Sequence, residues 1–219
     1  MLNLAFDTTA GSCSVILTQD GETIGKTIQK MDFGQAEALF PAIEKIMGEN
    51  RISPAELDLI TVCTGPGSFT GVRSSLAAAR TLGLALPQTG LTGVSAFEAY
   101  MYDLAEEELA FYNAVIIETK REDFYFQCFD SQKNKMGEPE ALEHDAIIDR
   151  LRHKKVTLIG DGVERFLSRP SGLSLHVIRM EDCLTIDALA ACGNQKFRLK
   201  KLDYPKPLYL RAPDVCIKA

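Results

Sequence analysis

Two short polar segments of the sequence carry residues that could bind a phosphate group or a metal ion. The first is Asp7-Thr8-Thr9, which follows the apolar run LNLAF. Carboxylate and hydroxyl oxygens are the ligands that magnesium prefers, so Asp7 and its neighbours could hold this ion or orient a phosphate. An aspartate at the end of a strand also commonly closes a turn, because its side chain accepts a hydrogen bond from the backbone two residues on. The sequence leaves both interpretations of Asp7 open.

The second segment is Gly65-Pro66-Gly67-Ser68, between the apolar run at 57–64 and a stretch rich in alanine, leucine and serine. Glycine permits backbone angles that are closed to other residues, and Ser68 or Thr70 can cap a helix. This pattern predicts a strand, a glycine turn and a helix, whose free N–H groups favour an anion. The alternative is a tight connection that only lets the strand and the helix pack together. The segment is neither a P-loop, since no Gly-Lys-Ser/Thr follows, nor a dinucleotide motif, since its third glycine comes one residue late.

The predicted helix at 70–86 has one face of small side chains. Residues three and four apart lie on the same side of a helix, and that side carries Ser75, Ala78, Ala79 and Leu82. We expect another helix to approach this face closely, either from this chain or from a partner. The opposite face, with Val72, Leu76 and Leu84, is expected to pack on the sheet, since a helix that is apolar or small nearly all round is covered on both sides.

No residue pattern identifies a catalytic centre. The three histidines lack HxxxH or HExxH spacing, no GxSxG elbow is present, and the six cysteines, without CxxC spacing, are expected to be free and mostly buried thiols. Two basic runs, at 150–155 and 198–201, are expected to complement helix C-termini rather than to contact tRNA. The sequence therefore predicts no metal site and does not require an enzyme.

Hydrophobic periodicity predicts an α/β chain built from two similar halves. Apolar runs that fit strands occur at 2–6, 12–18, 22–30, 57–64, 88–95, 113–118, 123–129, 155–160 and 176–179. Stretches with helical periodicity occur at 34–47, 70–86, 96–109, 141–153 and 185–200. Asp20-Gly21 is a strong hairpin signal. Both halves begin with strand, turn, strand and then a helix, which suggests a duplicated βββαβα unit and a division into residues 1–108 and 109–219.

Length and composition are those of a globular protein with one large domain or two small ones. The chain has 219 residues, of which 46% are hydrophobic and 25% charged, and it holds no apolar run long enough to span a membrane. The N-terminal MLNLAFDTT lacks the basic region and cleavage site of a secretory signal, so we expect a cytoplasmic protein that is not bound to a membrane. The formal net charge of −6 argues against broad contact between this chain alone and nucleic acid.

Four segments together resemble one protein family. LAFDTTAGSCSVIL, GQAEALFPAI, LITVCTGPGSFTGVRSSLAAARTLGLAL and KPLYLR are similar to the bacterial TsaB (YeaZ) family, and GPGSFTGVR is a highly specific string. These proteins are scaffold subunits of the system that makes threonylcarbamoyladenosine in tRNA. They are similar to the kinase-like TsaD subunit, from a group once labelled M22 glycoproteases. The resemblance, dense over residues 2–100 and thin beyond apart from the tail, implies the actin/Hsp70/sugar-kinase (ASKHA) fold: two α/β lobes, each with a mixed sheet and flanking helices.

The resemblance places Asp7 and Thr8 on the family's first phosphate-loop-like motif and residues 65–73 on its signature loop. It thus implies that a phosphate or nucleotide would contact Asp7, Thr8, Gly65, Gly67 and Ser68. Two positions depart from the family pattern: Glu118-Thr-Lys-Arg replaces an Asp-Ala-Arg-type turn, and Gln35 stands where histidine is common. The metal-binding histidines of the family belong to TsaD, and this sequence has no equivalent pair.

The function implied by the resemblance is that of a non-catalytic subunit that binds and stabilises a TsaD-like catalytic partner. A TsaE-like ATPase is expected in the same complex, tRNA is expected to bind only through the complex, and the chain alone is expected to form a homodimer. No cofactor is expected for the chain itself, whereas ATP or ADP and magnesium could join the assembled complex. The alternative is a degenerate ATP-dependent kinase or a glycopeptidase, and either would need a metal or base constellation that this sequence does not show.

Family members pair through their two N-terminal helices, which the resemblance places at 34–47 and 70–86. This agrees with the small face on the second of these helices. The implied interface residues are Gln35, Leu39, Ile43, Thr70, Arg73, Ser74, Ser75, Ala78 and Leu82.

Overall fold

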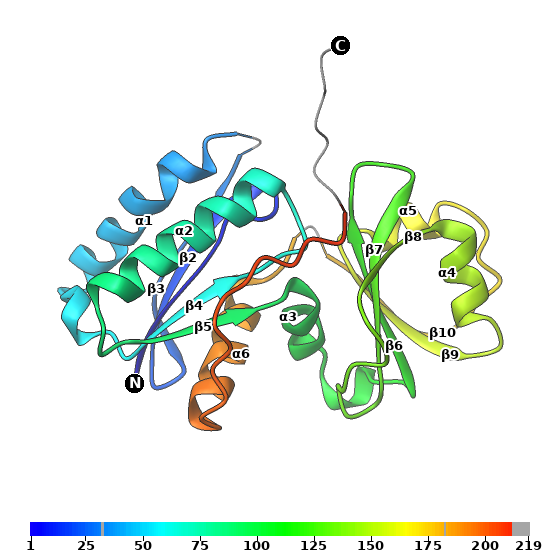
Figure 1. Cartoon of the computed structure of the whole chain (residues 1–219). Helices are drawn as coiled ribbons and strands as arrows, with labels where there is room; N and C mark the ends of the chain where they lie inside the picture. Colours follow the sequence, from blue (N-terminus) through cyan, green and yellow to red (C-terminus); the bar gives the residue numbers. More distant parts are fainter. Residues whose placement is uncertain (32, 182, 212–219) are drawn as a thin grey trace, which may run out of the picture.

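The computed structural model describes residues 1–31, 33–181 and 183–211, and it shows two lobes, each built on a five-stranded mixed sheet (Figure 1). The first sheet has the order β3-β2-β1-β4-β5. Its strands are β1 (Leu2–Asp7), β2 (Ser12–Gln19), β3 (Glu22–Lys30), β4 (Leu59–Cys63) and β5 (Gly90–Val94). The predicted hairpin is confirmed, because Asp20 and Gly21 have positive φ angles of 53° and 97°, as a two-residue turn between antiparallel strands requires.

The second sheet repeats the topology of the first. Its order is β10-β9-β6-β7-β8, formed by β6 (Tyr112–Glu118), β7 (Asp123–Phe129), β8 (Glu140–Glu143), β9 (Lys155–Gly160) and β10 (Ser174–Met180). In each sheet three antiparallel strands are followed by two strands parallel to the first of them. The predicted duplication of a βββαβα unit is therefore confirmed.

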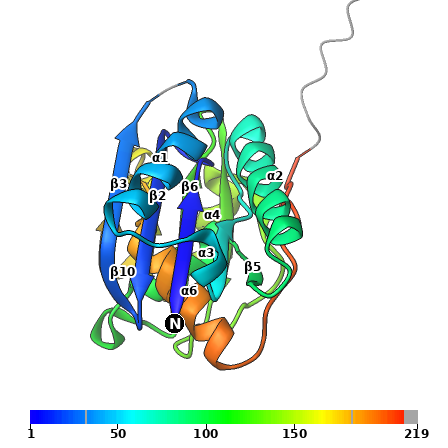
Figure 2. The ribbon, with the colours of Figure 1, turned by 90° about the vertical axis from the view of Figure 1, so that its left-hand side faces the viewer.

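Helices cover both faces of the first sheet. One face is covered by α1 (Gln35–Glu49) and α2 (Phe69–Ala85), and the other by α6 (Ile186–Arg198) (Figures 1 and 2). This follows from the strand sequence: Leu4 and Phe6 belong to the core shared with α1 and α2, whereas Ala5 belongs to the core shared with α6. Alternate residues of a strand point to opposite faces, so a continuous apolar run predicts a sheet that is buried on both sides.

The second sheet is covered by α4 (His144–Leu151) and α5 (Val163–Leu167) on its outer face and by α3 (Ala96–Asp103) on the face toward the first lobe. Two short 3₁₀ helices, at Pro54–Glu56 and Glu106–Glu108, complete the chain's regular structure among the described residues.

The two halves of the chain exchange their last helices. α3 ends the first half but packs on β6 and β9, and α6 ends the second half but packs on β1, β4 and β5. The two helices also contact each other, so one apolar core runs from the first sheet to the second. The structure therefore departs from a division at residue 108, because α6 belongs to the first lobe.

A buried polar network fixes α6 on the first sheet. Asn3 donates hydrogen bonds from Nδ2 to Asn194 Oδ1 (2.8 Å) and to the Ala190 carbonyl (3.2 Å), and Thr61 Oγ1 donates to Asn3 Oδ1 (3.0 Å). At Gly193 any Cβ would overlap the Thr61 side chain. The close approach and the satisfied network together set the position of α6 along the sheet, since buried polar groups are costly when they lose their partners.

On α2, Val72 and Leu76 are buried as predicted, but Leu84 is not, and the small face is covered from within the chain. Ser75, Ala78 and Ala79 are buried within the chain, where Ala78 and Ala79 join the core that α1 and the first sheet share, and Leu84 is 85% exposed. The small side chains serve close packing inside this lobe. Since small residues occur around most of α2, its pattern does not define which side faces the sheet.

This result corrects several of the expected interface positions. Four of them are buried in the chain's own core and are not available to a partner: Leu39, Ile43, Ser75 and Ala78. The other five remain at least partly accessible and stay predictions: Gln35, Thr70, Arg73, Ser74 and Leu82.

Smaller differences concern the ends of elements. Helix α1 runs without a break past Pro41, which lies on the exposed face of the helix, where a free carbonyl can bind water. The predicted helix 96–109 ends at Asp103, and β8 and α5 were not predicted because each is short. Within the described ranges no helix is long and apolar enough to cross a membrane. Cys13, Cys63, Cys128 and Cys192 are buried free thiols. Cys216 lies outside the described residues.

Candidate functional site

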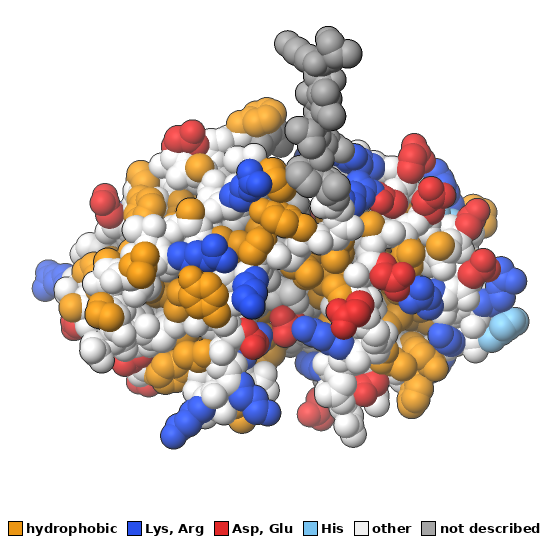
Figure 3. Space-filling view, in the orientation of Figure 1, with side chains coloured by type: hydrophobic (Ala, Val, Ile, Leu, Met, Phe, Trp, Pro, Cys, Tyr) orange, Lys and Arg blue, Asp and Glu red, His pale blue; other side chains and the backbone are white. Residues whose placement is uncertain are grey.

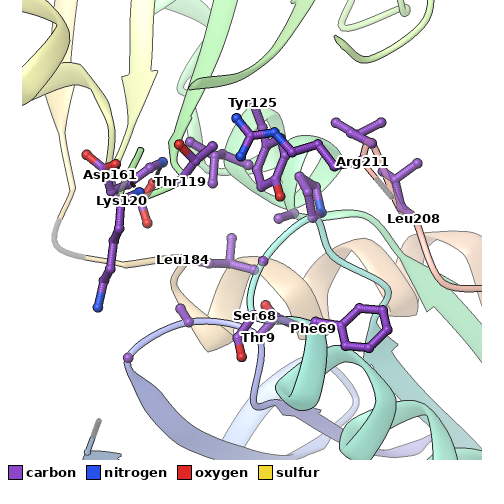
Figure 4. Close-up of a pocket in the computed structure, with 18 of the residues that line it drawn as sticks. Thr9, Ser68, Phe69, Thr119, Lys120, Tyr125, Asp161, Leu184, Leu208 and Arg211 are labelled. Atoms are coloured by element: carbon purple, nitrogen blue, oxygen red, sulfur yellow. Dashed lines mark hydrogen bonds between the residues drawn. The ribbon is translucent and has the colours of Figure 1, made fainter. Parts of the chain in front are cut away.

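A cavity of about 730 Å³ lies between the two lobes. Its walls come from residues 9–11 and 66–69 of the first lobe, residues 117–121 of the second, and residues 208–211 near the end of the described chain. Figure 4 shows Thr9, Ser68 and Phe69 on one side of this space. The cavity is the place where the loops singled out in the sequence meet the second lobe.

The glycine-rich loop packs directly on the loop that follows β1. The Ser68 N–H donates to the Thr9 carbonyl (2.7 Å), and Thr8 Oγ1 donates to the Gly71 carbonyl (2.7 Å). A Cβ at Gly67 or at Gly71 would overlap the backbone of Thr9 or Thr8. These glycines therefore allow the two loops to pack closely, and the backbone of Thr8 and Thr9 fills the space beside them.

Asp7 lies behind this contact and closes its own turn. Its side chain is 3% exposed, and its Oδ1 accepts a hydrogen bond from the Thr9 N–H (2.8 Å). Burial raises the pKa of the Asp7 carboxyl above its usual value, although the hydrogen bonds from Thr9 oppose that change. Asp7 and Thr8 do not line the cavity, so of the expected phosphate contacts only Gly67 and Ser68 reach its wall.

Ser68 is the cap of helix α2, as the sequence predicted for Ser68 or Thr70. Its Oγ accepts a hydrogen bond from the Gly71 N–H (3.3 Å). The strand, glycine turn and helix are thus confirmed, with the start of α2 at the cavity wall. The cap satisfies one of the N–H groups that an anion would otherwise bind.

In the second lobe, the turn after β6 is held by Arg165, a residue that the sequence did not single out. The Glu118 carboxylate accepts hydrogen bonds from Arg165 (2.6 and 2.9 Å) and from the Lys120 N–H (2.5 Å). Burial raises the pKa of Glu118, but the Arg165 guanidinium and the hydrogen bonds from the Lys120 and Thr119 N–H groups together outweigh it, so the net pKa lies below the ordinary value. The pairing joins residues 47 positions apart, which no local pattern can predict.

Asp161 lies between the two glycines of the Gly160-Asp161-Gly162 segment and lines the cavity. Its Oδ1 accepts a hydrogen bond from the Glu118 N–H (2.9 Å). Burial raises the pKa of Asp161 to about 6. Both glycines press against the backbone of β6, where a Cβ would collide with Ile116 or Ile117. They are close-packing residues, and the backbone of β6 fills the space beside them.

The segment after α6, residues 199–211, crosses from the first lobe to the second, and we call it the strap. It runs beside β5 and α2, on the side of α2 away from α1 (Figure 2). Its Leu208 N–H donates to the Thr64 carbonyl (2.9 Å). At its end Arg211 forms an ion pair with Asp123. Its guanidinium also lies over the Tyr125 ring (Figure 4). The strap therefore forms one side of the cavity.

The polar groups around the cavity do not fit a magnesium nucleotide bound by this chain alone. The Asp7 carboxylate is turned into its own loop, the Ser68 and Lys120 N–H groups are already bonded, and the Glu118 carboxylate is paired with Arg165. Across the described ranges, no three acidic, histidine or cysteine side chains converge to hold a metal ion. We therefore derive no step of chemistry through such a group.

A family model identifies the chain. The model for TsaD, tRNA N6-adenosine threonylcarbamoyltransferase, matches residues 34–157, which is more than half of the sequence. The chain belongs to the TsaD family. Within it, the expected resemblance to TsaB (YeaZ) proteins is confirmed by a relative of that name that matches 95% of this chain.

Two curated relatives and two solved structures are similar to this chain in sequence or in fold. The TsaB protein of Haemophilus influenzae is 27% identical over 95% of this chain and 92% of its own length. That of Buchnera aphidicola is 40% identical, and the match spans 38% of each protein. A Pseudomonas aeruginosa protein similar to peptidase YEAZ has a TM-score of 0.79 and 21% identity, over 96% of this chain and 99% of that one.

A Bacteroides thetaiotaomicron protein with an actin-like ATPase fold has a TM-score of 0.50 and 10% identity, over 87% of this chain and 95% of that one. At such identities the structures show the fold alone. They confirm the predicted two-lobed fold of the actin type, with mixed sheets and flanking helices.

Proposed function

We propose that this chain is an accessory subunit in the synthesis of threonylcarbamoyladenosine in tRNA, and that it acts by docking on a TsaD-type catalytic subunit. The family model is that of a tRNA N6-adenosine threonylcarbamoyltransferase, and the relatives are named tRNA threonylcarbamoyladenosine biosynthesis protein TsaB. In this proposal the chain performs no chemistry of its own. A TsaE-like ATPase and tRNA join through the assembled complex, and the free chain pairs with a second copy.

The observation that carries the non-catalytic part of the proposal is the closed contact between the two loops. An enzyme of the phosphate-transfer type needs open N–H donors and an accessible carboxylate at this point of the fold. Here Asp7 is buried and bonded to Thr9, and Gly67 lies against the Thr9 backbone. A group so enclosed cannot reach a substrate in the cavity unless the loops separate.

The docking surface we propose is the exposed side of α1 and α2. It presents three large apolar side chains: Phe33, just before α1, is 90% exposed, Phe40 is 43% exposed and Leu84 is 85% exposed. Figure 3 shows hydrophobic side chains on this part of the molecule, over α1 and α2. Aromatic and aliphatic residues exposed together on a helix pair are typical of protein interfaces.

The test is reconstitution of tRNA modification with a TsaD-type catalytic subunit and unmodified tRNA, with threonylcarbamoyladenosine measured by mass spectrometry. We expect product only when this chain is present. Leu84→Arg should fold normally, because the side chain is exposed, and it should prevent both partner binding and product formation. Phe111→Arg is the matched control, since Phe111 is 65% exposed in the second lobe and lies outside the proposed surface.

Two results would contradict the proposal. If the chain is dispensable for product formation, it is not the accessory subunit. If the purified chain alone hydrolyses ATP or cleaves a glycopeptide, and Asp7→Ala abolishes that turnover, the chain is itself an enzyme.

A further inference from the structure

The cations of this acidic protein are not spread evenly. No aspartate or glutamate occurs between Asp58 and Glu98, nor from Tyr204 to Arg211, although the whole chain has a net charge of −6. Those two acid-free stretches contain α2 and most of the strap, which lie side by side in the fold. These two stretches carry four cations, which we call the basic track: Arg73, Arg80, Lys206 and Arg211.

Cations of the basic track are held beside aromatic rings. Arg80 donates to the Pro205 carbonyl (2.7 Å) and lies over the Tyr204 ring at 5.4 Å. Arg73 lies over the Phe69 ring at 3.7 Å and donates to the Tyr209 hydroxyl (3.3 Å). These contacts join α2 to the strap and leave the rings in reach of solvent.

Most of these cations are not neutralised by the chain. Across the described ranges, no carboxylate forms an ion pair with Arg73, Arg80 or Lys206. The one acidic residue within the strap, Asp203, accepts a hydrogen bond from Lys196 (2.9 Å) instead. Figure 3 shows lysine and arginine side chains spaced over this face, with hydrophobic side chains between them. Unpaired cations gathered in a row attract a polyanion.

We propose that the basic track binds the phosphate backbone of an RNA, which is tRNA if the proposed function holds. Two observations favour RNA over an acidic protein. Tyr204 and Tyr209 are 61% and 42% exposed, and rings placed beside cations are stacking positions for unpaired bases. The centre of a protein interface is also depleted of charged residues, whereas this face carries Arg73, Arg80 and Lys206 without a carboxylate partner among the described residues.

The track borders the protein interface proposed above, because Arg73, Arg80 and Leu84 lie on one face of α2 at spacings of seven and four residues. The strap lies on the side of α2 away from α1 (Figure 2), and Arg80 and Lys206 are not among the residues expected to contact a protein partner. A subunit docked over α1 would leave the strap open, and one that also covers Leu84 would border Arg80. Because the rest of the chain is acidic, RNA would be directed to this one face, which is consistent with weak binding by the chain alone.

The experiment measures binding of the full chain to an unmodified tRNA transcript by fluorescence anisotropy over a series of salt concentrations. Each phosphate contact contributes about 0.7 to 0.9 to the slope of log affinity against log salt. We expect Lys206→Gln and Arg80→Gln each to make the slope shallower by about that amount, so that each variant loses about threefold less affinity than the wild type between about 50 and 200 mM salt. Lys45→Gln, on α1 and 65% exposed, should leave the slope unchanged.

Stacking is tested separately from charge. Tyr204→Ser should weaken binding of the tRNA transcript by about fivefold or more without changing the salt slope. It should leave binding of an oligoglutamate peptide unchanged. If the oligoglutamate binds as tightly as tRNA and Tyr204→Ser affects neither, the track is a docking site for an acidic protein and the proposal is wrong.

The salt-slope experiment and the tRNA-modification experiment can fail independently of each other. If the wild-type chain supports tRNA modification while the Lys206 and Arg80 variants keep the wild-type salt slope, only the RNA track is refuted. If the chain does not support modification, the proposed function falls, and the salt slopes still decide whether this face binds RNA.

Discussion

Replacing Asp161 with asparagine should make the protein more stable at neutral pH. Asparagine can still accept the hydrogen bond from the Glu118 N–H through its side-chain oxygen, so the 2.9 Å contact is kept. What changes is the charge, which burial disfavours: the pKa of Asp161 is raised from 3.8 to about 6. The substitution therefore removes the cost of ionising a buried carboxyl and leaves its geometry intact.

The sign and size of the effect follow from proton linkage. A carboxyl whose folded pKa is raised contributes stability that is fully present below its unfolded pKa and is lost as pH rises through the folded pKa. For Asp161 this window runs from 3.8 to about 6, and the whole loss is about 3 kcal/mol. By pH 5 about half of it has occurred, so the advantage of Asp161→Asn should grow by about 1.4 kcal/mol between about pH 5 and pH 8.

The assay is urea unfolding of the wild type and Asp161→Asn at several pH values, followed by circular dichroism. Asp149→Asn is the control, because Asp149 is 68% exposed and pairs with Arg152 on the surface, where such pairs contribute little. A stability difference that is independent of pH would refute the reasoning, since a raised pKa must appear as a pH-dependent free energy. A less stable variant at pH 8 would show that the Asp161 charge is favourable.

Three further predictions concern packing and pairing. Gly193→Ala should lower the free energy of unfolding by about 3 kcal/mol, because the added Cβ would overlap the Thr61 side chain beneath α6. Gly48→Ala, where the space around the Cβ is open, should raise the free energy of unfolding by up to about 1 kcal/mol. Urea unfolding measures both changes. Ala78→Arg, at 5% exposure, should prevent folding, and a native circular dichroism spectrum would show that α2 can turn that face outward. Arg165→Gln should lower the free energy of unfolding by about 1 kcal/mol at pH 7, because it leaves Glu118 without its ion-pair partner. This difference should shrink as the pH falls below about 4.5 in the same urea experiment, because the pKa of Glu118 is lowered in the folded protein.

The sequence by itself determined the elements that depend on short-range patterns. The Asp20-Gly21 hairpin and the Ser68 cap were predicted because a turn or a helix start depends on the conformational freedom and hydrogen bonding of a few neighbouring residues. The specific string around the glycine turn also gave the family and, through it, the two-lobed fold. Its role in the site was left open, because the same glycines suit a phosphate and a close contact between loops.

Only the tertiary structure decided what each of these elements faces. Leu84 is exposed although it was predicted to face the sheet, and Ala78 is buried in this chain's own core and not left for a partner. The reason is that a helix that is small on most sides takes its orientation from the neighbours that pack on it. In the same way, α6 joins the first lobe although it ends the second half of the chain. The pairing of Glu118 with Arg165 likewise joins residues far apart in sequence, and such contacts follow from the assembled sheets, since no local spacing encodes them.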